Sequence, residues 1–145
     1  MSSHDNVVDE FLTLLGFMRE RFFRPATQMT RNWLSPGQFH ALVILDKNGP
    51  MSMSELAGEM KVSKQQLTPL INKLIDSGLA ARKTDESDRR IIRIEITDSG
   101  GDKVHSLMTE MRQRFRKRIQ VLPEHELAEL DQMLKRIKEI LSHID

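Results

Sequence analysis

The chain of 145 residues contains no cysteine, which excludes disulfides, thiolate zinc sites, iron–sulfur clusters, cysteine nucleophiles and thiol-based redox sensing. It also lacks any apolar run approaching the ~20 residues that are needed to cross a bilayer. Its first residues, Met1 to Asp5, lack the basic and then apolar pattern of a signal peptide. These absences predict a cytoplasmic protein without a membrane partner.

Enzyme signatures are missing as well. The sequence has no phosphate-binding glycine loop, no nucleophile elbow and no paired-acid pattern. The histidines are scattered without the spacing of a metal site, at His4, His40, His105, His125 and His143. We therefore expect no enzyme activity, no cofactor and no metal, although a regulatory metal site assembled across a dimer stays open.

The composition suits one soluble globular domain, with 39% hydrophobic and 30% charged residues and no internal repeat. The net charge is only +1, but residues 61–93 hold eight basic and four acidic residues, while the last 22 residues carry a net −3. A polyanionic partner would therefore meet the middle of the chain. A second basic run, residues 112–118, is interpreted as the solvated face of a long helix.

Apolar residues at helical spacing mark both ends of the chain. They predict a helix over residues 7–23, a second from about Gly100 to Leu122, and a last one from Glu124 to Leu141. The first helix and the last two each expose a wide apolar surface, which needs more than one neighbour to cover it. Packing against the same helices of a second chain would cover it, so we expect a homodimer formed through these three helices.

Three capping boxes begin helices in the middle of the chain, at Ser35, Ser52 and Ser63, each followed three residues later by Gln or Glu. The second of these helices runs through about Met60 and the third through about Ser77. Only about three residues separate them, which predicts a helix-turn-helix. The second helix of such a pair usually reads DNA.

The helix that starts at Ser63 has two distinct faces. One face is apolar and is expected to be buried, at Leu67, Leu70, Ile71, Leu74 and Ile75. The opposite face is polar, rich in hydrogen-bond donors and free of acids until Asp76, at Lys64, Gln65, Thr68, Pro69, Asn72 and Lys73. A face of this composition suits contact with duplex DNA.

The spacing of the apolar residues changes after this helix, from that of a helix to that of a strand. Ile92, Ile94 and Ile96 alternate with polar residues, which predicts a half-buried strand, and residues 79–84 can supply its antiparallel partner. The tip, residues 85–90, contains no glycine, so we expect an open loop rather than a tight two-residue turn. A β-hairpin placed directly after a helix-turn-helix is a wing.

This order of elements resembles the MarR (multiple antibiotic resistance regulator) family of bacterial winged-helix transcription factors, over nearly the whole chain. The most specific residues are Ser54-Glu55-Leu56-Ala57, Val62-Ser63-Lys64, Gly78-Leu79 and, above all, Asp85-Glu86-Ser87-Asp88-Arg89-Arg90 followed by Thr97 and Gly100. The fold expected is mainly α: four helices, a β-hairpin wing and two further helices in a single domain, 1–145. Residues 35–99 would form the DNA-binding lobe, and residues 1–34 and 100–145 the dimerisation lobe.

The resemblance also implies how DNA is bound. A homodimer would place one recognition helix in each of two successive major grooves of a pseudo-palindromic operator, and one wing arginine in each flanking minor groove. On this chain that arginine is Arg90, with Asp88 orienting the loop by ion pairing and Arg89 as a less certain neighbour. The alternative for Arg90 is a solvated arginine paired with Asp85 or Asp88.

Other candidate contacts follow from side-chain chemistry. Basic side chains can neutralise phosphates, Gln and Asn side chains suit adenine edges, and the Thr68 methyl or the Pro69 ring can meet a thymine methyl. The full DNA-binding set is Ser63, Lys64, Gln65, Gln66, Thr68, Pro69, Asn72, Lys73, Arg82, Lys83, Asp88, Arg89 and Arg90. Two alternatives stay open: Gln66 as the capping partner of Ser63, and Asn72 as a surface residue without a partner.

Two residues depart from the family's pattern. Pro69 lies inside the recognition helix, where it removes the hydrogen bond to the Gln65 carbonyl at a cost of roughly 3 kcal/mol. This predicts a local bend, or a freed carbonyl bonded to water or DNA. Lys61 stands where such turns often hold glycine, which leaves a strained left-handed residue open at that position.

Members of this family commonly bind anionic aromatic or lipophilic effectors between the dimer helices and the DNA-binding lobe. The candidates here are Phe11, Phe17, Arg21, Phe39 and His40. The leading hypothesis is a dimeric transcriptional repressor or regulator bound to duplex DNA and released by such a ligand. One alternative is a winged helix that docks an acidic protein partner without specific DNA binding. Another is a ligand-binding protein with vestigial DNA affinity.

Overall fold

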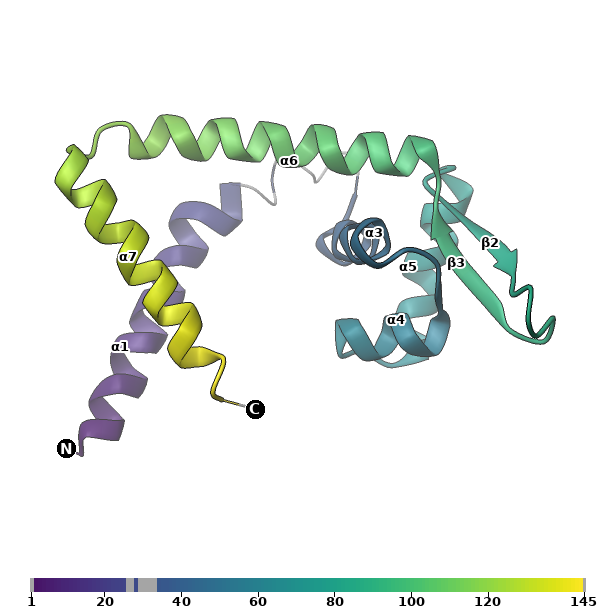
Figure 1. Ribbon diagram of the computed structural model, residues 1–145, viewed down its shortest axis with the longest axis horizontal. Coiled ribbons are helices and arrows are strands. Elements are labelled where there is room, and N and C mark those ends of the chain that lie inside the picture. The colour runs from purple at the N-terminus through teal and green to yellow at the C-terminus, as the bar shows by residue number, and fades with distance from the viewer. Residues whose placement is uncertain (1, 26–27, 29–33, 145) are drawn as a thin grey trace. The chain divides into compact units, whose positions relative to one another are not determined.

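The computed structural model describes residues 2–25, 28 and 34–144 (Figure 1). The chain divides into two compact units, Met1–Thr109 and Glu110–Asp145. Across the described ranges, no helix combines the length and the apolar composition that a membrane span requires.

The N-terminal helix, α1 (Ser3–Met18), continues into a π-helical turn, η1 (Arg19–Phe23). The helix predicted over residues 7–23 is confirmed, but it begins four residues earlier. The reason is local: Ser2 and Asp5 form a capping box, with Asp5 N donating to Ser2 Oγ at 3.2 Å and Ser2 N donating to Asp5 Oδ2 at 3.0 Å. Apolar spacing alone does not reveal such a polar first turn.

Three helices follow in the middle of the chain: α3 (Pro36–Asn48), α4 (Met53–Met60) and α5 (Lys64–Asp76). Figure 1 shows them gathered beside the two strands of the hairpin. The turn between α4 and α5 contains Lys61 at φ 54° and ψ 43°, so this residue adopts the left-handed conformation. The predicted helix-turn-helix is therefore present.

The capping predictions hold in two of three cases. Ser35 and Ser63 each take part in a complete capping box with the glutamine three residues on. At Ser52 the hydroxyl accepts from Glu55 N at 3.1 Å, whereas the Glu55 carboxylate accepts from Arg93 at 3.1 Å. The box predicted at Ser52 is therefore corrected to an N-cap, because a strand arginine engages the Glu55 carboxylate.

The sheet has three antiparallel strands, β1 (Met51–Ser52), β2 (Ala80–Thr84) and β3 (Ile92–Ile96), in the order β1-β3-β2. The hairpin was predicted and is confirmed, with its open loop over residues 85–91. Strand β1 was not predicted, because a strand of two residues is too short to show alternation of apolar and polar side chains. Within β3, Ile94 is buried but Ile92 is 50% exposed, because Ile92 lies beside the loop. Ile96 is half-buried, like its polar neighbour Glu95, so of the three isoleucines expected on the inner face only Ile94 is buried.

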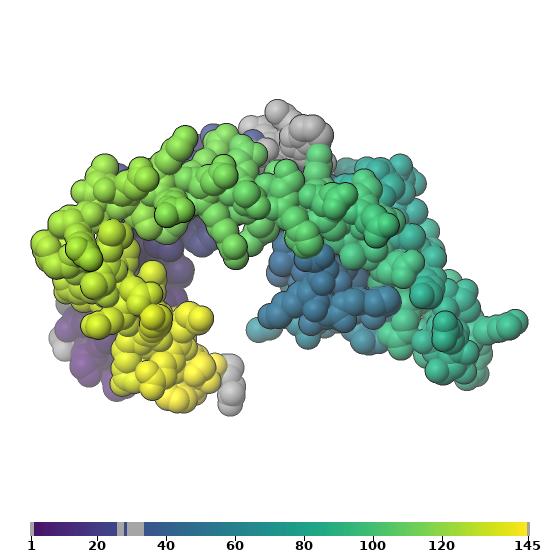
Figure 2. Space-filling view, turned by 45° about the horizontal axis from the view of Figure 1, so that its top comes forward, coloured from purple at the N-terminus to yellow at the C-terminus, as the bar shows by residue number. Residues whose placement is uncertain are grey.

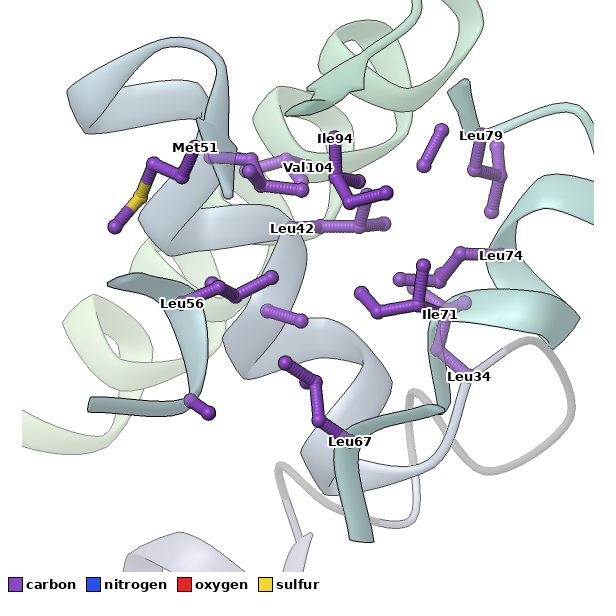
Figure 3. Packing of buried hydrophobic residues seen from close by; sticks show 14 of the residues in the cluster. Leu34, Leu42, Met51, Leu56, Leu67, Ile71, Leu74, Leu79, Ile94 and Val104 are labelled. Carbon is purple, nitrogen blue, oxygen red and sulfur yellow. The ribbon is translucent and has the colours of Figure 1, made fainter. Parts of the chain in front are cut away.

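One hydrophobic core joins these elements (Figure 3). Its fully buried large side chains come from α3, α4, α5 and β3, at Leu42, Leu45, Leu56, Leu67, Ile71, Leu74 and Ile94. On α5, three of the five residues expected to be buried are so, while Leu70 and Ile75 are half-buried. We call this part of the molecule, residues 34–109, the winged-helix lobe.

Two further helices complete the chain, α6 (Asp98–Ile119) and α7 (Glu124–Leu141), as predicted. The start of α6 is anchored on the lobe: Thr97 Oγ1 donates to the Gly78 carbonyl at 2.6 Å, and Gly100 is packed directly against the Leu79 carbonyl. Val104 belongs to the core. In contrast, no residue of α1 or α7 is buried.

Candidate DNA-binding site

The outer face of α5 is exposed at every position predicted for it, namely Lys64, Gln65, Thr68, Pro69, Asn72 and Lys73. This orientation follows from the inner face, where Leu67, Ile71 and Leu74 are held in the core. The first turn of α5 contains no acidic residue. The helix therefore presents donors and positive charge to solvent.

Pro69 lies inside α5, and the helix continues through it. Since proline has no N–H, the Gln65 carbonyl lacks its usual helical donor. One residue earlier, the Thr68 hydroxyl donates to the Lys64 carbonyl at 2.8 Å, so this hydroxyl is already engaged. The local bend stays a prediction.

Two of the polar candidates already have protein partners. Gln66 Oε1 accepts from Ser63 N at 3.0 Å, so the capping role of Gln66 is confirmed. Asn72 Oδ1 accepts from Arg82 Nη2 at 2.7 Å, a contact between α5 and β2. The alternative of Asn72 as a residue without a partner is therefore wrong. The sequence could not show this contact because it depends on how the strand crosses the helix.

The wing consists of β2, the loop 85–91 and β3, and the space-filling view shows it standing out at the edge of the lobe (Figure 2). At its tip Arg90 is 90% exposed and paired with Asp88, at 3.1 Å for Nε to Oδ1 and 3.0 Å for Nη2 to Oδ2. Hydrogen bonds from Arg90 hold the pKa of Asp88 below its usual value, and Asp88 raises the pKa of Arg90. Arg90 is thus a solvated arginine paired with Asp88, as the alternative described it, and its entry into the minor groove stays a prediction.

Three residues that support this loop were not predicted. Arg93 Nε donates to Asp85 Oδ1 at 2.9 Å, and Arg93 Nη1 donates to Glu55 Oε1 at 3.1 Å. Arg93 lowers the pKa of Asp85, while the Ser52 hydroxyl and, after it, Arg93 lower that of Glu55. The sequence shows only that an arginine follows the acidic tip of the wing. Without the strand register, this does not identify which carboxylates the arginine contacts.

The remaining basic candidates lie along the wing. Lys83 and Arg89 are exposed, and Lys83 Nζ lies 3.9 Å from Glu95 Oε2 on the neighbouring strand. Arg82 is exposed as well, although one of its donors is engaged by Asn72. The α5 face and the wing are adjacent in the lobe and together carry the positive charge that the sequence placed between residues 61 and 93.

The effector candidates lie on three elements, α1, η1 and α3. On α1 and η1, Phe11 and Phe17 are exposed, and the Arg21 guanidinium carbon lies 5.2 Å from the centroid of the Phe17 ring. On α3, Phe39 packs against the core and His40 is exposed. Their role in ligand binding stays a prediction.

Among the described residues, no group of three or more His, Asp or Glu side chains could hold a metal ion. His105 of α6 instead pairs with Asp46 of α3, at 3.0 Å between Nε2 and Oδ2. This pair links the first turns of α6 to the lobe.

Comparison with known proteins identifies relatives of this chain. Residues 34–92 match the MarR family. The HTH-type transcriptional regulator YpoP of Bacillus subtilis is 31% identical over 125 residues, covering 86% of this chain and 89% of that protein. The HTH-type transcriptional repressor MdtR of the same organism is 25% identical over 130 residues, covering 89% and 84%.

Solved structures agree with the fold. A MarR family protein from Bacillus stearothermophilus superposes with a TM-score of 0.84 at 20% identity, over 97% of this chain and 99% of that one. The multiple antibiotic resistance repressor MarR superposes with a TM-score of 0.74 at 19% identity, over 86% and 92%. Taken with the wing motif, these relatives show that the chain belongs to the MarR family of DNA-binding, winged helix-turn-helix transcriptional regulators, which are not enzymes.

Proposed function

We propose that this chain represses transcription as a homodimer bound to a pseudo-palindromic operator, and that a small anionic aromatic or lipophilic effector releases it. The observation that carries the proposal is the exposed, acid-free outer face of α5 next to a wing whose tip arginine is 90% exposed. Repression is favoured because MdtR, which matches 89% of this chain, is a repressor.

The candidate residues have different roles in DNA binding, which follow from their side-chain chemistry. Lys64, Lys73 and Lys83 neutralise phosphates, which supplies affinity and salt dependence but little specificity. Gln65 is the better base reader of the two glutamines, since the side-chain carbonyl of Gln66 is engaged in the cap of α5. Arg90 enters the minor groove, where its long exposed side chain and fixed charge are attracted by the negative potential.

Dimerisation rests on the apolar residues of the first and last helices. On α1 these include Val7, Val8, Leu12 and Phe17, and on α7 Met133, Leu134, Ile137, Ile140 and Leu141, all between 38% and 68% exposed. Apolar surface of this extent is rare on a monomer and is covered in an obligate dimer. Two recognition helices about 34 Å apart then match one turn of DNA.

The effector would act by favouring a dimer in which the two recognition helices have the wrong separation. Phe11, Phe17, Arg21, Phe39 and His40 supply aromatic surface and positive charge for such a ligand. Effector candidates can be screened by the loss of operator binding, and replacing Arg21 with Ala is expected to weaken the response to anionic ligands.

The test is to select fragments bound by the chain from a random DNA pool and to measure affinity at two salt concentrations. We expect an enriched sequence with two-fold symmetry and an affinity that falls steeply with salt. Arg90→Ala is expected to weaken binding about tenfold or more, and Arg136→Ala on α7 is the control for loss of one exposed positive charge. Binding without an enriched sequence would favour a winged helix that docks an acidic protein, and an Arg90→Ala protein with full affinity would remove the wing arginine from the proposed DNA contacts.

A further inference from the structure

A continuous set of hydrogen bonds connects the helix-turn-helix to the loop of the wing. It begins at Glu55 in the first turn of α4, which accepts from Arg93 Nη1 at 3.1 Å. Arg93 lies on β3 and donates through Nε to Asp85 Oδ1 at 2.9 Å. The second oxygen of the same carboxylate, Asp85 Oδ2, accepts from Asp88 N at 3.0 Å. The set thus passes from a helix, through a strand, into the loop.

The connection ends at Arg90. Asp88 Oδ1 accepts from Arg90 N at 3.0 Å and from Arg90 Nε at 3.1 Å, while Asp88 Oδ2 accepts from Arg90 Nη2 at 3.0 Å. Every link has at least one charged partner, and charge-assisted hydrogen bonds are about twice as strong as neutral ones. Arg90 is therefore held by a carboxylate whose own position depends on the residues before it.

Arg93 is the centre of this arrangement because it contacts two different elements at once. Its planar guanidinium presents several donors in a fixed geometry, which lets it serve two carboxylates without rearrangement. Its side chain is 30% exposed, against 90% for Arg90 at the tip. The tip loop contains no glycine. Its other internal hydrogen bonds are between backbone groups: Asp85 N donates to the Ile91 carbonyl, and Ile91 N donates to the Asp88 carbonyl.

We propose that Arg93 is a positioning residue for DNA binding, which orders the loop through Asp85 and Asp88 so that Arg90 is in place before DNA arrives. The proposal rests on the proposed role of Arg90 in the minor groove. Ordering a flexible loop during binding costs affinity, and a loop ordered beforehand avoids that cost. Arg93 then contributes to affinity through Arg90 and not through a phosphate of its own.

A double-mutant cycle distinguishes an effect of Arg93 that acts through Arg90 from a direct contact between Arg93 and a phosphate. Arg93→Ala is expected to weaken binding to the selected operator about tenfold in the parent chain and less than about twofold in an Arg90→Ala background. The matched control is Lys83→Met, which removes a cation from the position directly opposite Arg93 in the strand register. Its effect is expected to be equal in both backgrounds, as for an independent phosphate contact. Equal losses for Arg93→Ala in both backgrounds would overturn the proposal.

A second measurement needs no DNA. Amide hydrogen exchange in the loop 85–91 of the free protein is expected to be faster in Arg93→Ala and unchanged in Lys83→Met. Arg93→Lys, which can serve only one carboxylate well, should lie between the parent and Arg93→Ala, and it replaces Arg93→Ala if that variant does not fold. Unchanged exchange in the loop would overturn the proposal. If Arg90→Ala alone leaves DNA affinity intact, the proposed function fails at the wing, while exchange still decides whether Arg93 orders the loop.

Discussion

The winged-helix lobe and the terminal helices use the same apolar residue types in opposite ways. In the lobe, Leu42, Leu56 and Leu74 have no exposed surface, and the chain itself covers them. On α1 and α7 no residue is buried, although α1 carries leucine, valine and phenylalanine and α7 carries leucine and isoleucine. The lobe therefore has its own core, whereas the terminal helices carry exposed apolar surface, which the proposed dimer would cover.

The largest expected effect comes from deleting core volume in the lobe. Leu42→Ala should lower the free energy of unfolding by about 2–5 kcal/mol, because it removes a fully buried side chain and leaves a cavity. The matched change on α7 is Leu134→Ala, whose effect should depend on protein concentration if the proposed dimer covers this side chain. Denaturation at several concentrations checks both. Equal, concentration-independent losses would contradict the distinction between the two regions.

The next effect tests how closely α6 is packed on the lobe. Gly100→Ala should lower the free energy of unfolding by about 1–3 kcal/mol, since a Cβ would collide with the Leu79 carbonyl and the Ile96 side chain. Its neighbour gives the control: at Gly101 a Cβ meets only Asp46 Oδ1, at 3.8 Å. Gly101→Ala should stabilise the helix by up to about 1 kcal/mol. Loss of stability in both variants would argue against the close packing.

A charged residue introduced on α7 tests the role of the terminal helices directly. Ile137→Glu should raise the dimer dissociation constant about tenfold or more and weaken operator binding with it, because an unpaired carboxylate would be buried in the interface. Gln132→Glu, which adds the same charge at another exposed position of α7, is the control. Sedimentation across a concentration series measures the effect. A dimer that tolerates Ile137→Glu would place the interface elsewhere.

A smaller effect is expected at the start of the recognition helix. Ser63→Ala should cost about 1 kcal/mol of unfolding free energy, since it removes the hydroxyl that accepts from Gln66 N at 3.1 Å. Ser106→Ala, at an exposed position inside α6, should be neutral or slightly stabilising. Thermal unfolding followed by circular dichroism compares the two, and an equal response at both sites would exclude a capping contribution.

The smallest expected effect is a change in how the stability of the protein depends on pH. The pKa of Asp85 is lowered in the folded protein, first of all by its hydrogen bond with Arg93. Its contribution to stability is therefore complete above the pKa of the unfolded chain, about 4, and is lost as pH falls through the lowered folded value. Asp85→Asn should destabilise the protein at pH 7 and lose that disadvantage in acid. A constant difference in melting temperature from pH 7 to pH 2.5 would contradict this assignment.

The sequence predicted most of the fold because its signals were local. The serines at 35 and 63, the period change at Ile92 and the missing glycine in the tip each specify backbone geometry within a few residues. The errors have the same explanation. Strand β1 is too short to carry a period, and the partners of Asn72 and Glu55 lie 10 and 38 residues away along the chain. Contacts at such separations depend on register and packing.

What the sequence determined by itself is the order of elements, the inner and outer faces of α5, and an arginine at the wing tip, because periodicity and capping act over one or two turns. What only the tertiary structure decided is which polar side chains are already engaged. Arg93 joins Glu55 and Asp85 because β3 pairs between β1 and β2 and so carries its side chain between α4 and the loop. Hydrogen bonds of that kind exist only once separate segments have been packed together.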